Sequence, residues 1–267
     1  MAHTYLNQQL VWITGASSGI GEALAVSAAR SGARLILSAR RRSELERVAA
    51  LCTGAASVRI VPLDLADTAS VVQAATEVMT RDGLPDVLVN NAGVTQRALA
   101  REATLDVVRS LMEVNFFGTV ALTGQLLPAM HRRGSGRIVV ISSVAGKLGT
   151  PLRSGYAAAK HALHGYFDSL RAEEHDHGLR VTVVCPGFIR TPISQSALTA
   201  SGAAQGSMDA GQSAGMDAGE CAQRIWQAVG QEREEVVIAG LKEGSGVYLK
   251  RFAPGLLNRI VRKAKVV

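Results

Sequence analysis

Short apolar runs rich in β-branched residues alternate with helical segments along almost the whole chain. Seven of these runs predict strands, at residues 10–13, 35–38, 58–63, 85–89, 137–141, 179–184 and 235–238. Segments with apolar residues at helical spacing lie between them, near 20–31, from about 43, and at 68–80, 104–131, 155–177 and 217–229. This alternation is typical of an open parallel sheet covered by helices on both faces. The sequence therefore predicts an α/β fold with one doubly wound sheet of about seven strands.

The amount of apolar material predicts a single folding unit. Of the 267 residues, 47% are hydrophobic, which suffices for one sizeable core, so we expect one domain over residues 1–267. No run approaches the ~18 consecutive apolar residues of a membrane span, and residues 1–6 lack the features of a secretory signal. Cys52, Cys185 and Cys221 are far apart and show no Cys-x-x-Cys spacing, which predicts buried, reduced thiols. These observations indicate a cytoplasmic protein.

Most of the positive charge lies at the C-terminal end. Seven Lys and Arg residues but only one acidic residue, Glu243, follow residue 240. This segment therefore accounts for +6 of the net charge of +7. The body of the chain is thus nearly neutral, so we expect no nucleic acid partner. Apolar residues at helical spacing after Pro254 predict a basic amphipathic tail at about 241–267. Such a tail can pack on its own subunit or on a partner subunit, or it can rest on an anionic membrane surface.

The segment after the sixth predicted strand is built largely of Ser, Gly, Ala, Gln and Met, and Met-Asp-Ala-Gly begins at both Met208 and Met216. Such a composition suits a flexible linker. An irregular stretch of this length inside a domain can instead form a functional lid. Because the segment directly follows a strand end, we expect a flexible substrate loop at about 188–219.

The residues that follow the first two predicted strands suit a dinucleotide. Ligands of open parallel sheets bind beyond the carboxyl ends of the strands. Gly15, Gly19 and Gly21 allow a tight turn there, and the next helix offers its N-terminal N–H groups to a pyrophosphate. After the second strand stand Arg40 and Arg41, where a guanidinium attracts the 2′-phosphate of NADP and a carboxylate would repel it. NADP(H) is therefore favoured over NAD(H).

Tyr156 and Lys160 form the candidate proton-transfer pair. Four residues apart on a predicted helix, their side chains share one face. A fixed ammonium near a phenol favours the phenolate and lowers the phenol pKa. We therefore expect Tyr156 to exchange a proton near neutral pH.

Several short motifs stand in the order found in one enzyme family. They are Thr14-Gly15-Ala16-Ser17-Ser18-Gly19-Ile20-Gly21, Asn90-Asn91-Ala92-Gly93, Asn115, Ser143, Tyr156-x-x-x-Lys160 and Pro186-Gly187. On these residues the chain resembles the classical short-chain dehydrogenases/reductases over nearly its whole length, which implies a Rossmann-type fold. Residues 248–255 also resemble the steroid-dehydrogenase-like branch of that family.

The resemblance implies a set of cofactor-binding residues. They are Gly15, Ser17, Gly19, Ile20 and Gly21 at the pyrophosphate and ribose, Arg40 at the 2′-phosphate, Asp64 and Leu65 beside the adenine, Asn91 and Gly93 along the cofactor floor, and Pro186, Ile189 and Thr191 at the nicotinamide half, where Lys160 and Tyr156 also lie. One position departs from the pattern, because Ser18 stands where many NADP-preferring members carry a second basic residue.

The same resemblance implies four catalytic residues, Asn115, Ser143, Tyr156 and Lys160. Tyr156 would act as general acid or base and Ser143 would hydrogen-bond the substrate oxygen. Lys160 would lower the Tyr156 pKa and bind the nicotinamide ribose, and Asn115 would hold a water that links Lys160 to solvent. Ser142, the neighbour of Ser143, should point to the other side of its strand.

These residues predict an NADP(H)-dependent oxidoreductase that interconverts a ketone or aldehyde with an alcohol. The expected pocket walls, at Thr95, Gln96, Val144, Leu148 and Thr150, suggest a lipophilic substrate. Two alternatives remain open: a 3-oxoacyl-thioester reductase and a non-catalytic NADPH-binding regulatory protein. The resemblance also implies a homodimer or homotetramer. The spacing of the histidines at 161, 164, 175 and 177 matches no metal motif, so no metal is expected.

Overall fold

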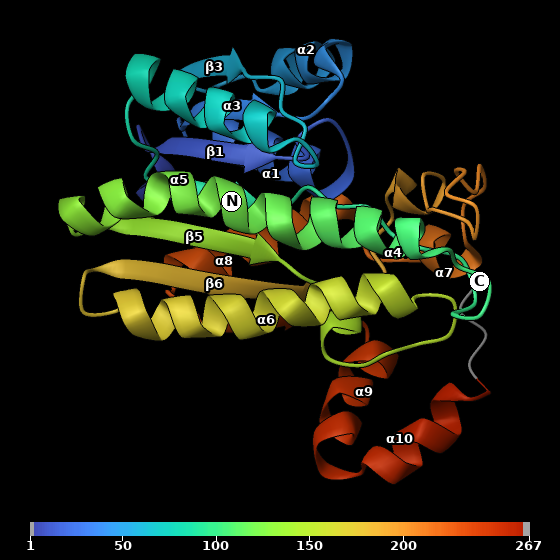
Figure 1. The fold of residues 1–267 in the computed structure, drawn as a ribbon. Helices are drawn as coiled ribbons and strands as arrows, with labels where there is room; N and C mark the ends of the chain where they lie inside the picture. The colour runs from blue at the N-terminus through green and yellow to red at the C-terminus, as the bar shows by residue number, and fades with distance from the viewer. Residues whose placement is uncertain (1–2, 264–267) are drawn as a thin grey trace.

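A seven-stranded, all-parallel sheet forms the centre of the protein (Figure 1). The structure, a computed structural model, describes residues 3–263, so residues 264–267 of the predicted tail lie outside the described residues. The strands are β1 (Leu10–Thr14), β2 (Arg34–Ser38), β3 (Ser57–Ile60), β4 (Val87–Asn90), β5 (Gly136–Ile141), β6 (Leu179–Pro186) and β7 (Glu235–Ile238), in the order β3-β2-β1-β4-β5-β6-β7. The predicted fold class is confirmed. β3 ends earlier than expected, before Pro62, which has no N–H for the ladder.

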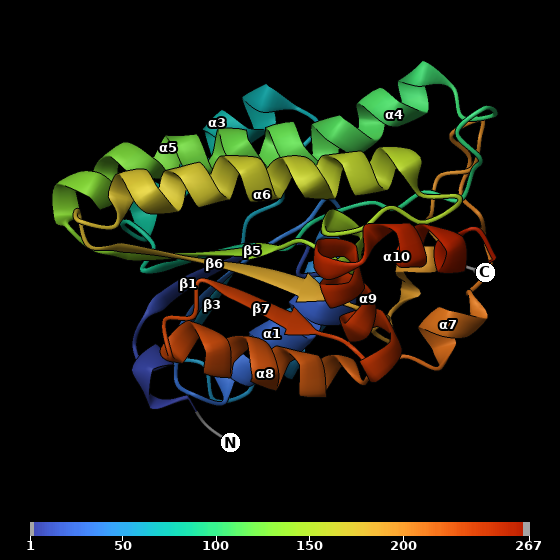
Figure 2. The ribbon, with the colours of Figure 1, turned by 90° about the horizontal axis from the view of Figure 1, so that it is seen from below.

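Helices cover both faces of this sheet (Figure 2). On one face lie α1 (Gly19–Ala29), α2 (Arg42–Leu51) and α8 (Ala218–Gly230), packed on Val11 and Ile13 of β1. On the other lie α3 (Thr68–Arg81), α5 (Gly118–Arg133) and α6 (Ser154–Glu174), packed on Leu10 and Trp12 of the same strand. Successive side chains of a strand point to opposite faces, so a strand that is apolar throughout builds two cores.

The predicted helix at 104–131 is interrupted. α4 (Leu105–Met112) leads into a π-helical turn at Glu113–Phe117, and α5 continues from Gly118. Asn115 lies in this turn, and its side-chain amide donates to the Leu111 carbonyl at 2.8 Å. Insertions of this kind occur frequently at functional sites. The turn therefore marks Asn115 for attention independently of any motif.

The segment after β6 is folded against the body. It contains a 3₁₀ turn at Pro192–Ser194 and the short helix α7 (Ala210–Ser213), and isolated bridges pair Ile189 with Met216 and Gln96 with Leu198. The segment thus crosses back over the loop that follows β4.

A pair of helices near the C-terminal end of the described residues projects from the body (Figure 1). α10 (Pro254–Val261) begins at the predicted proline, whereas α9 (Leu241–Phe252) was not expected. Leu257 of α10 is buried against Val144 and Leu148, so the pair is anchored beside the carboxyl end of β5. Within residues 3–263, every helix is too short or too polar to cross a membrane.

Candidate active site

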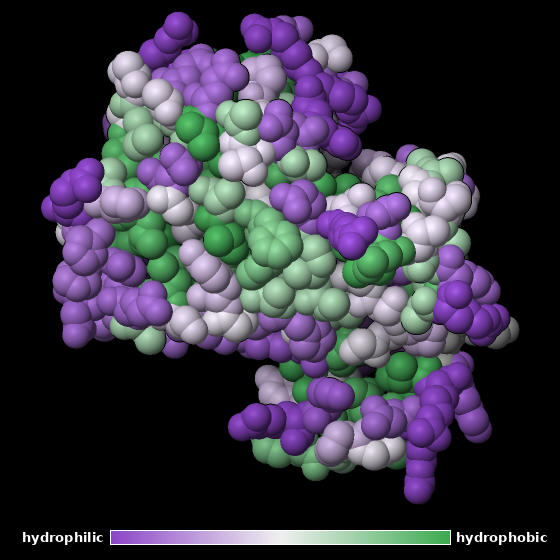
Figure 3. Space-filling model, viewed as in Figure 1, coloured by the Kyte–Doolittle hydropathy of each residue, from purple (hydrophilic) through white to green (hydrophobic). Residues whose placement is uncertain are grey.

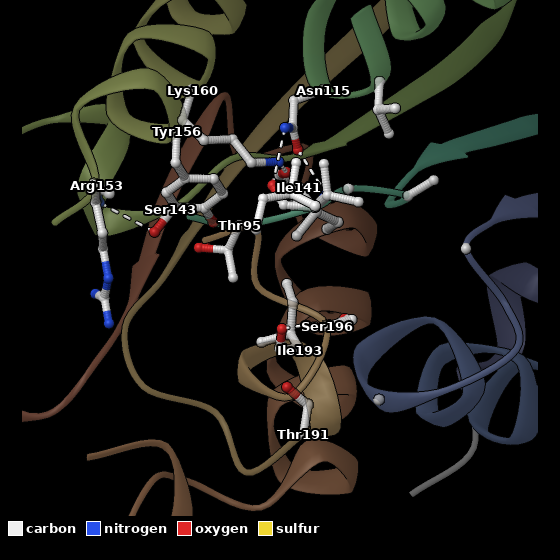
Figure 4. A pocket seen from close by; sticks show the side chains of 18 of the residues that line it. Thr95, Asn115, Ile141, Ser143, Arg153, Tyr156, Lys160, Thr191, Ile193 and Ser196 are labelled. Atoms are coloured by element: carbon white, nitrogen blue, oxygen red, sulfur yellow. Dashed lines mark hydrogen bonds between the residues drawn. The ribbon is translucent and has the colours of Figure 1, made fainter. Parts of the chain in front are cut away.

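One cleft of about 1830 Å³ opens at the carboxyl ends of the strands, across the switch between β1 and β4. Asn115, Ser143, Tyr156 and Lys160 all line it (Figure 4). The expected cofactor residues that also line it are Gly15, Ser17, Gly19, Ile20, Arg40, Asp64, Leu65, Asn91, Gly93, Pro186, Ile189 and Thr191. Gly21 is absent from this wall, and so is Gln96, which we had expected beside the substrate.

Backbone geometry explains the glycines at one end of the cleft. Gly15 and Gly19 have φ values of +63° and +60°, which L side chains rarely adopt. Gly21 does not line the cleft, but it lets α1 pack closely against the turn, because a Cβ there would lie 2.3 Å from the Gly15 carbonyl oxygen. The turn leads directly into α1, whose N-terminal N–H groups can receive a phosphate. This cradle fits the pyrophosphate of a dinucleotide.

Thr14 joins the two strands at the switch point. It begins the glycine motif, but no role was expected for its side chain. Its hydroxyl donates to the Val89 carbonyl at 3.1 Å and accepts from the N–H groups of Asn91 at 3.0 Å and Ala92 at 3.1 Å. The Asn91 amide in turn donates to the Thr14 carbonyl at 2.9 Å. These bonds fix the cleft floor between β1 and β4.

Tyr156 and Lys160 leave the same face of α6, as their spacing predicts (Figure 4). The Lys160 ammonium donates to the Ile141 carbonyl at 2.8 Å, and burial lowers the Lys160 pKa to about 8. Its nitrogen lies 5.8 Å from the centre of the Tyr156 ring. Gly93 leaves room for this arrangement, since a Cβ there would lie 2.6 Å from the Asn115 oxygen and 3.4 Å from the Lys160 nitrogen.

The pKa of Tyr156 differs from the sequence expectation. Burial of the phenol raises it above the ordinary value, because the phenolate would lose its hydration. A hydrogen bond with Ser143 and the positive charges of Arg153 and Arg97 oppose this rise. The structure therefore keeps Tyr156 protonated at neutral pH.

The two serines after β5 separate as predicted. Ser143 caps a 3₁₀ turn, where its hydroxyl accepts from the Ala145 N–H at 3.0 Å, and its side chain lies beside Tyr156 in the cleft (Figure 4). The Ser142 hydroxyl instead contacts α6, 3.0 Å from His164 Nε2 and 3.3 Å from the Lys160 carbonyl. Ser142 thus ties the strand to the helix.

Asn115 is fully buried and joins the π-helical turn to the loop after β4. Its side-chain oxygen accepts from the Val94 N–H at 3.1 Å, and its amide donates to the Val94 carbonyl at 2.9 Å. With these bonds and the one to Leu111, both amide hydrogens are engaged. A water held by Asn115 would have to donate to one of its oxygens.

Gln96 holds the start of the helix that carries Tyr156. Its side-chain oxygen accepts from the N–H groups of Gly155 at 2.8 Å and Tyr156 at 3.3 Å. The expectation that Gln96 forms a pocket wall was wrong, because these first-turn donors have no partner inside the helix. No sequence signal indicates this contact, since the partners are 59 and 60 residues apart.

A second group of residues missed by sequence reasoning is charged. Arg97 and Arg153 line the cleft, and Arg97 forms a buried ion pair with Asp209 from the segment after β6. None of the three belongs to a recognised motif.

The histidines and cysteines lie outside the cleft wall. Among the described residues, His164, Cys185 and Glu235 form a group whose potential ligand atoms lie within 4.8 Å of one another. Burial raises the pKa of the Cys185 thiol to about 12, which opposes the thiolate that a metal requires. All three cysteines are buried and free, as predicted.

Comparisons with known proteins agree with this geometry. A sequence model of the family described as short chain dehydrogenase matches residues 9–201. Dehydrogenase/reductase SDR family member 7B of Danio rerio is 43% identical over 263 residues, covering 96% of this chain and 85% of that protein. A short-chain dehydrogenase from Streptomyces avermitilis superposes with a TM-score of 0.78 at 31% identity, covering 95% of this chain and 94% of that one. An alcohol dehydrogenase from Thermococcus sibiricus, complexed with 5-hydroxy-NADP, superposes with a TM-score of 0.75 at 27% identity, covering 86% and 95%.

The resemblance seen in the motifs is thus confirmed. The chain belongs to the short-chain dehydrogenase/reductase family of oxidoreductases, whose fold binds a nicotinamide cofactor.

Proposed function

We propose that the protein is an NADP(H)-dependent oxidoreductase that interconverts a lipophilic ketone or aldehyde with its alcohol. The observation that carries this proposal is the convergence of Tyr156, Ser143 and Lys160 in the cleft that also holds the glycine turn. The cofactor, when bound, supplies or accepts the hydride. Asn115, Ser143, Tyr156 and Lys160 are proposed as the catalytic residues.

The protein groups supply the proton and steady the charge. Because burial keeps Tyr156 protonated, the phenol can donate its proton to a carbonyl oxygen at neutral pH. Ser143, hydrogen-bonded to Tyr156, can donate to the same oxygen as negative charge develops there. Lys160, with a pKa near 8, is mainly charged at neutral pH and can attract the proton-deficient phenolate.

Two arginines support NADP(H) over NAD(H). Arg40 and Arg41 are exposed at the cleft edge after β2, where a 2′-phosphate would lie. Ser18 lines the same end of the cleft without adding a second charge.

Apolar side chains in the cleft support the proposal of a lipophilic substrate. Val144, Leu148, Ile193 and Leu198 line the cleft, and so do Leu257 and Ile260 of α10. The segment 188–219 supplies one wall, so we keep its proposed role as a substrate loop.

The projecting helices support a peripheral membrane contact. Leu241, Tyr248 and Phe252 are 95%, 67% and 81% exposed on α9. Lys242, Lys250 and Arg251 lie on the same helix, and Figure 3 shows hydrophobic and strongly hydrophilic atoms together on this part of the molecule. Basic and apolar groups in one exposed helix suit an anionic lipid surface. Cytoplasmic location and self-association into a homodimer or homotetramer remain proposals.

A second candidate is the reduction of a 3-oxoacyl thioester carried by an acidic protein. Lys242 of α9 and Lys263, just after α10, line the cleft together with one acidic residue, Glu243, so this side of the cleft carries a net positive charge. An acidic carrier would be attracted to such a surface.

The Tyr156→Phe variant tests the catalytic assignment. It deletes the proton donor with little change of volume, so NADPH binding should persist while turnover of carbonyl substrates falls by ~100-fold or more. Tyr166→Phe, on the same helix and only partly buried, is the matched control. Turnover by Tyr156→Phe within a few-fold of wild type would refute the assignment. Tight NADPH binding without turnover of any carbonyl by the wild type would favour the regulatory alternative.

A further inference from the structure

A buried ion pair joins the segment 188–219 to the loop that follows β4. The side chains of Arg97 and Asp209 are 5% and 1% exposed. Arg97 Nε donates to Asp209 Oδ2 at 2.7 Å, and Arg97 Nη2 donates to the same oxygen. The other carboxylate oxygen, Oδ1, accepts from Gln205 Nε2 at 2.9 Å. The pair therefore links two parts of the chain that are 112 residues apart.

Arg97 has hydrogen-bond partners on all three nitrogens of its guanidinium group. Besides the bonds to Asp209, its Nη1 donates to the Gln96 carbonyl at 2.6 Å and to the Thr95 hydroxyl at 3.2 Å. Burial opposes ionisation of Asp209, but hydrogen bonds from Arg97 and Gln205 hold its pKa below the ordinary value, so it is a carboxylate. The pair is therefore a structural tie. Removing Asp209 alone would leave the guanidinium buried without this counter-ion, which is far more costly than removing both charges.

Backbone hydrogen bonds hold the same two parts of the chain together. The Arg97 N–H donates to the Leu198 carbonyl at 2.9 Å, and the Leu198 N–H donates to the Thr95 carbonyl at 2.8 Å. The Asp209 N–H donates to the Ser194 hydroxyl at 3.2 Å, so Asp209 is itself fixed within its segment. Residues 95–98 and 194–209 therefore form one wall.

This wall also holds the start of α6. The Gln96 side-chain oxygen accepts from the N–H groups of Gly155 and Tyr156. Arg153, at the N-cap of α6 and beside Tyr156 in Figure 4, has its Nη2 3.8 Å from Asp209 Oδ2. Asp209 itself does not line the cleft, so it can affect a bound substrate only through these neighbours.

We propose that Asp209 and Arg97 are positioning residues of the proposed reaction: their ion pair fixes the wall formed by residues 95–98 and 194–209, and this wall holds Tyr156 in place. The proposal rests on the proposed function, in which Tyr156 donates the proton. A displacement of about 1 Å at a reacting group can lower turnover ~100-fold. The segment 188–219 therefore sets the position of the proton donor in addition to lining the cleft.

Hydrogen exchange of individual backbone amides, measured by NMR on the full chain, tests this link without turnover. Asp209→Asn preserves the size of the side chain and removes its charge. We expect the Gly155 and Tyr156 amides to exchange ~10-fold or more faster than in the wild type, the size of one charge-assisted hydrogen bond. The amide of Ala222, a buried residue of α8, should keep its rate. Faster exchange only within residues 188–219, or an equal increase at all three amides, would overturn the proposal.

The kinetics of a double variant separate positioning from packing. Arg97→Met/Asp209→Leu removes both buried charges together and should fold, because apolar replacement of a whole buried pair is often tolerated. We expect kcat for carbonyl reduction to fall by ~10-fold or more and the KM for NADPH to stay within about 2-fold. Arg224→Met/Glu220→Leu, at an exposed ion pair of α8, is the matched control and should leave both constants unchanged. A kcat within about 2-fold of wild type in the folded double variant would show that packing alone suffices and would overturn the proposal.

Failure of the positioning role and failure of the proposed function give different results. A wild type that turns over no carbonyl would refute the proposed function, whereas the exchange rates at Gly155 and Tyr156 would still decide whether Asp209 holds the helix start. Turnover by the wild type together with unchanged exchange in Asp209→Asn would refute the positioning role alone.

Discussion

Gln96→Leu should weaken both the fold and the catalytic geometry, although Gln96 itself does not line the cleft. Its side-chain oxygen accepts from two N–H groups in the first turn of α6, at Gly155 and Tyr156. Leucine has a similar size and no acceptor. The substitution therefore leaves two buried donors unsatisfied at the helix start, next to the residue proposed as proton donor.

The expected loss of stability follows from these contacts. An orphaned buried donor costs ~1–3 kcal/mol, and the longer bond, at 3.3 Å, belongs near the lower end. The Gln96 amide nitrogen has no hydrogen-bond partner among the described residues, so removing it recovers part of the cost. We expect a net loss of ~1–3 kcal/mol in the free energy of unfolding and, from displacement of Tyr156, a fall in kcat of ~10-fold or more.

Urea denaturation followed by circular dichroism measures the first effect, and steady-state turnover measures the second. Gln73→Leu, an exposed position of α3, is the matched control and should change stability by less than ~0.5 kcal/mol. A loss below ~0.5 kcal/mol for Gln96→Leu, with kcat unchanged, would show that water or local relaxation satisfies the helix start. The proposed positioning role would then be wrong.

Three further predictions concern the cofactor, pH and the projecting helices. Arg40→Glu should weaken NADPH binding by ~10-fold or more and leave NADH binding unchanged. Arg42→Glu, outside the cleft wall, should affect the two cofactors equally. An equal loss of affinity for both cofactors in Arg40→Glu, measured by fluorescence titration, would count against the assignment. Burial lowers the His164 pKa from 6.5 to about 4, so the unfolded chain binds a proton at a higher pH than the folded chain does. Relative to His164→Gln, the free energy of unfolding of the wild type should fall by ~1–3 kcal/mol as the pH drops from 6.5 towards 4. Parallel pH profiles of unfolding for the two proteins would contradict this. Phe252→Ser should reduce co-sedimentation with anionic vesicles by ~10-fold. Leu105→Ser, which also replaces an exposed apolar side chain, should not reduce it. Equal, salt-insensitive binding of both variants would argue against a membrane contact.

The fold could be predicted because its signals are local. A parallel strand buried on both faces is a short apolar run, and the residues after it form the ligand edge of the sheet. For this reason the seven strands and the cleft position of Gly15 followed from local sequence patterns. The cleft positions of Ser143, Tyr156 and Lys160 were implied by the family resemblance.

The features that the sequence did not predict depend on contacts between residues distant in sequence, or on a local change of helix type such as the π-helical turn at Glu113–Phe117. Gln96 meets its partners 59 and 60 residues away, and Arg97 meets Asp209 112 residues away. α9 contains Gly244, Ser245 and Gly246, a composition that weakens any helix prediction. In the structure, Gly246 has a packing reason, since a Cβ there would lie 3.2 Å from the Leu148 side chain. The raised Tyr156 pKa likewise depends on burial, which spacing along a helix does not reveal.

The π-helical turn at Asn115 divides one long helical run between two interiors. Before it, Val107 and Leu111 of α4 pack with Tyr156 and Leu198 in a small cluster at the substrate side. After it, Leu122 and Leu126 of α5 belong to the core on the sheet. Substitutions in the first half can therefore reshape the substrate wall while the sheet core keeps its packing. Because of this turn, substrate specificity can change through α4 without a loss in the free energy of unfolding that depends on α5.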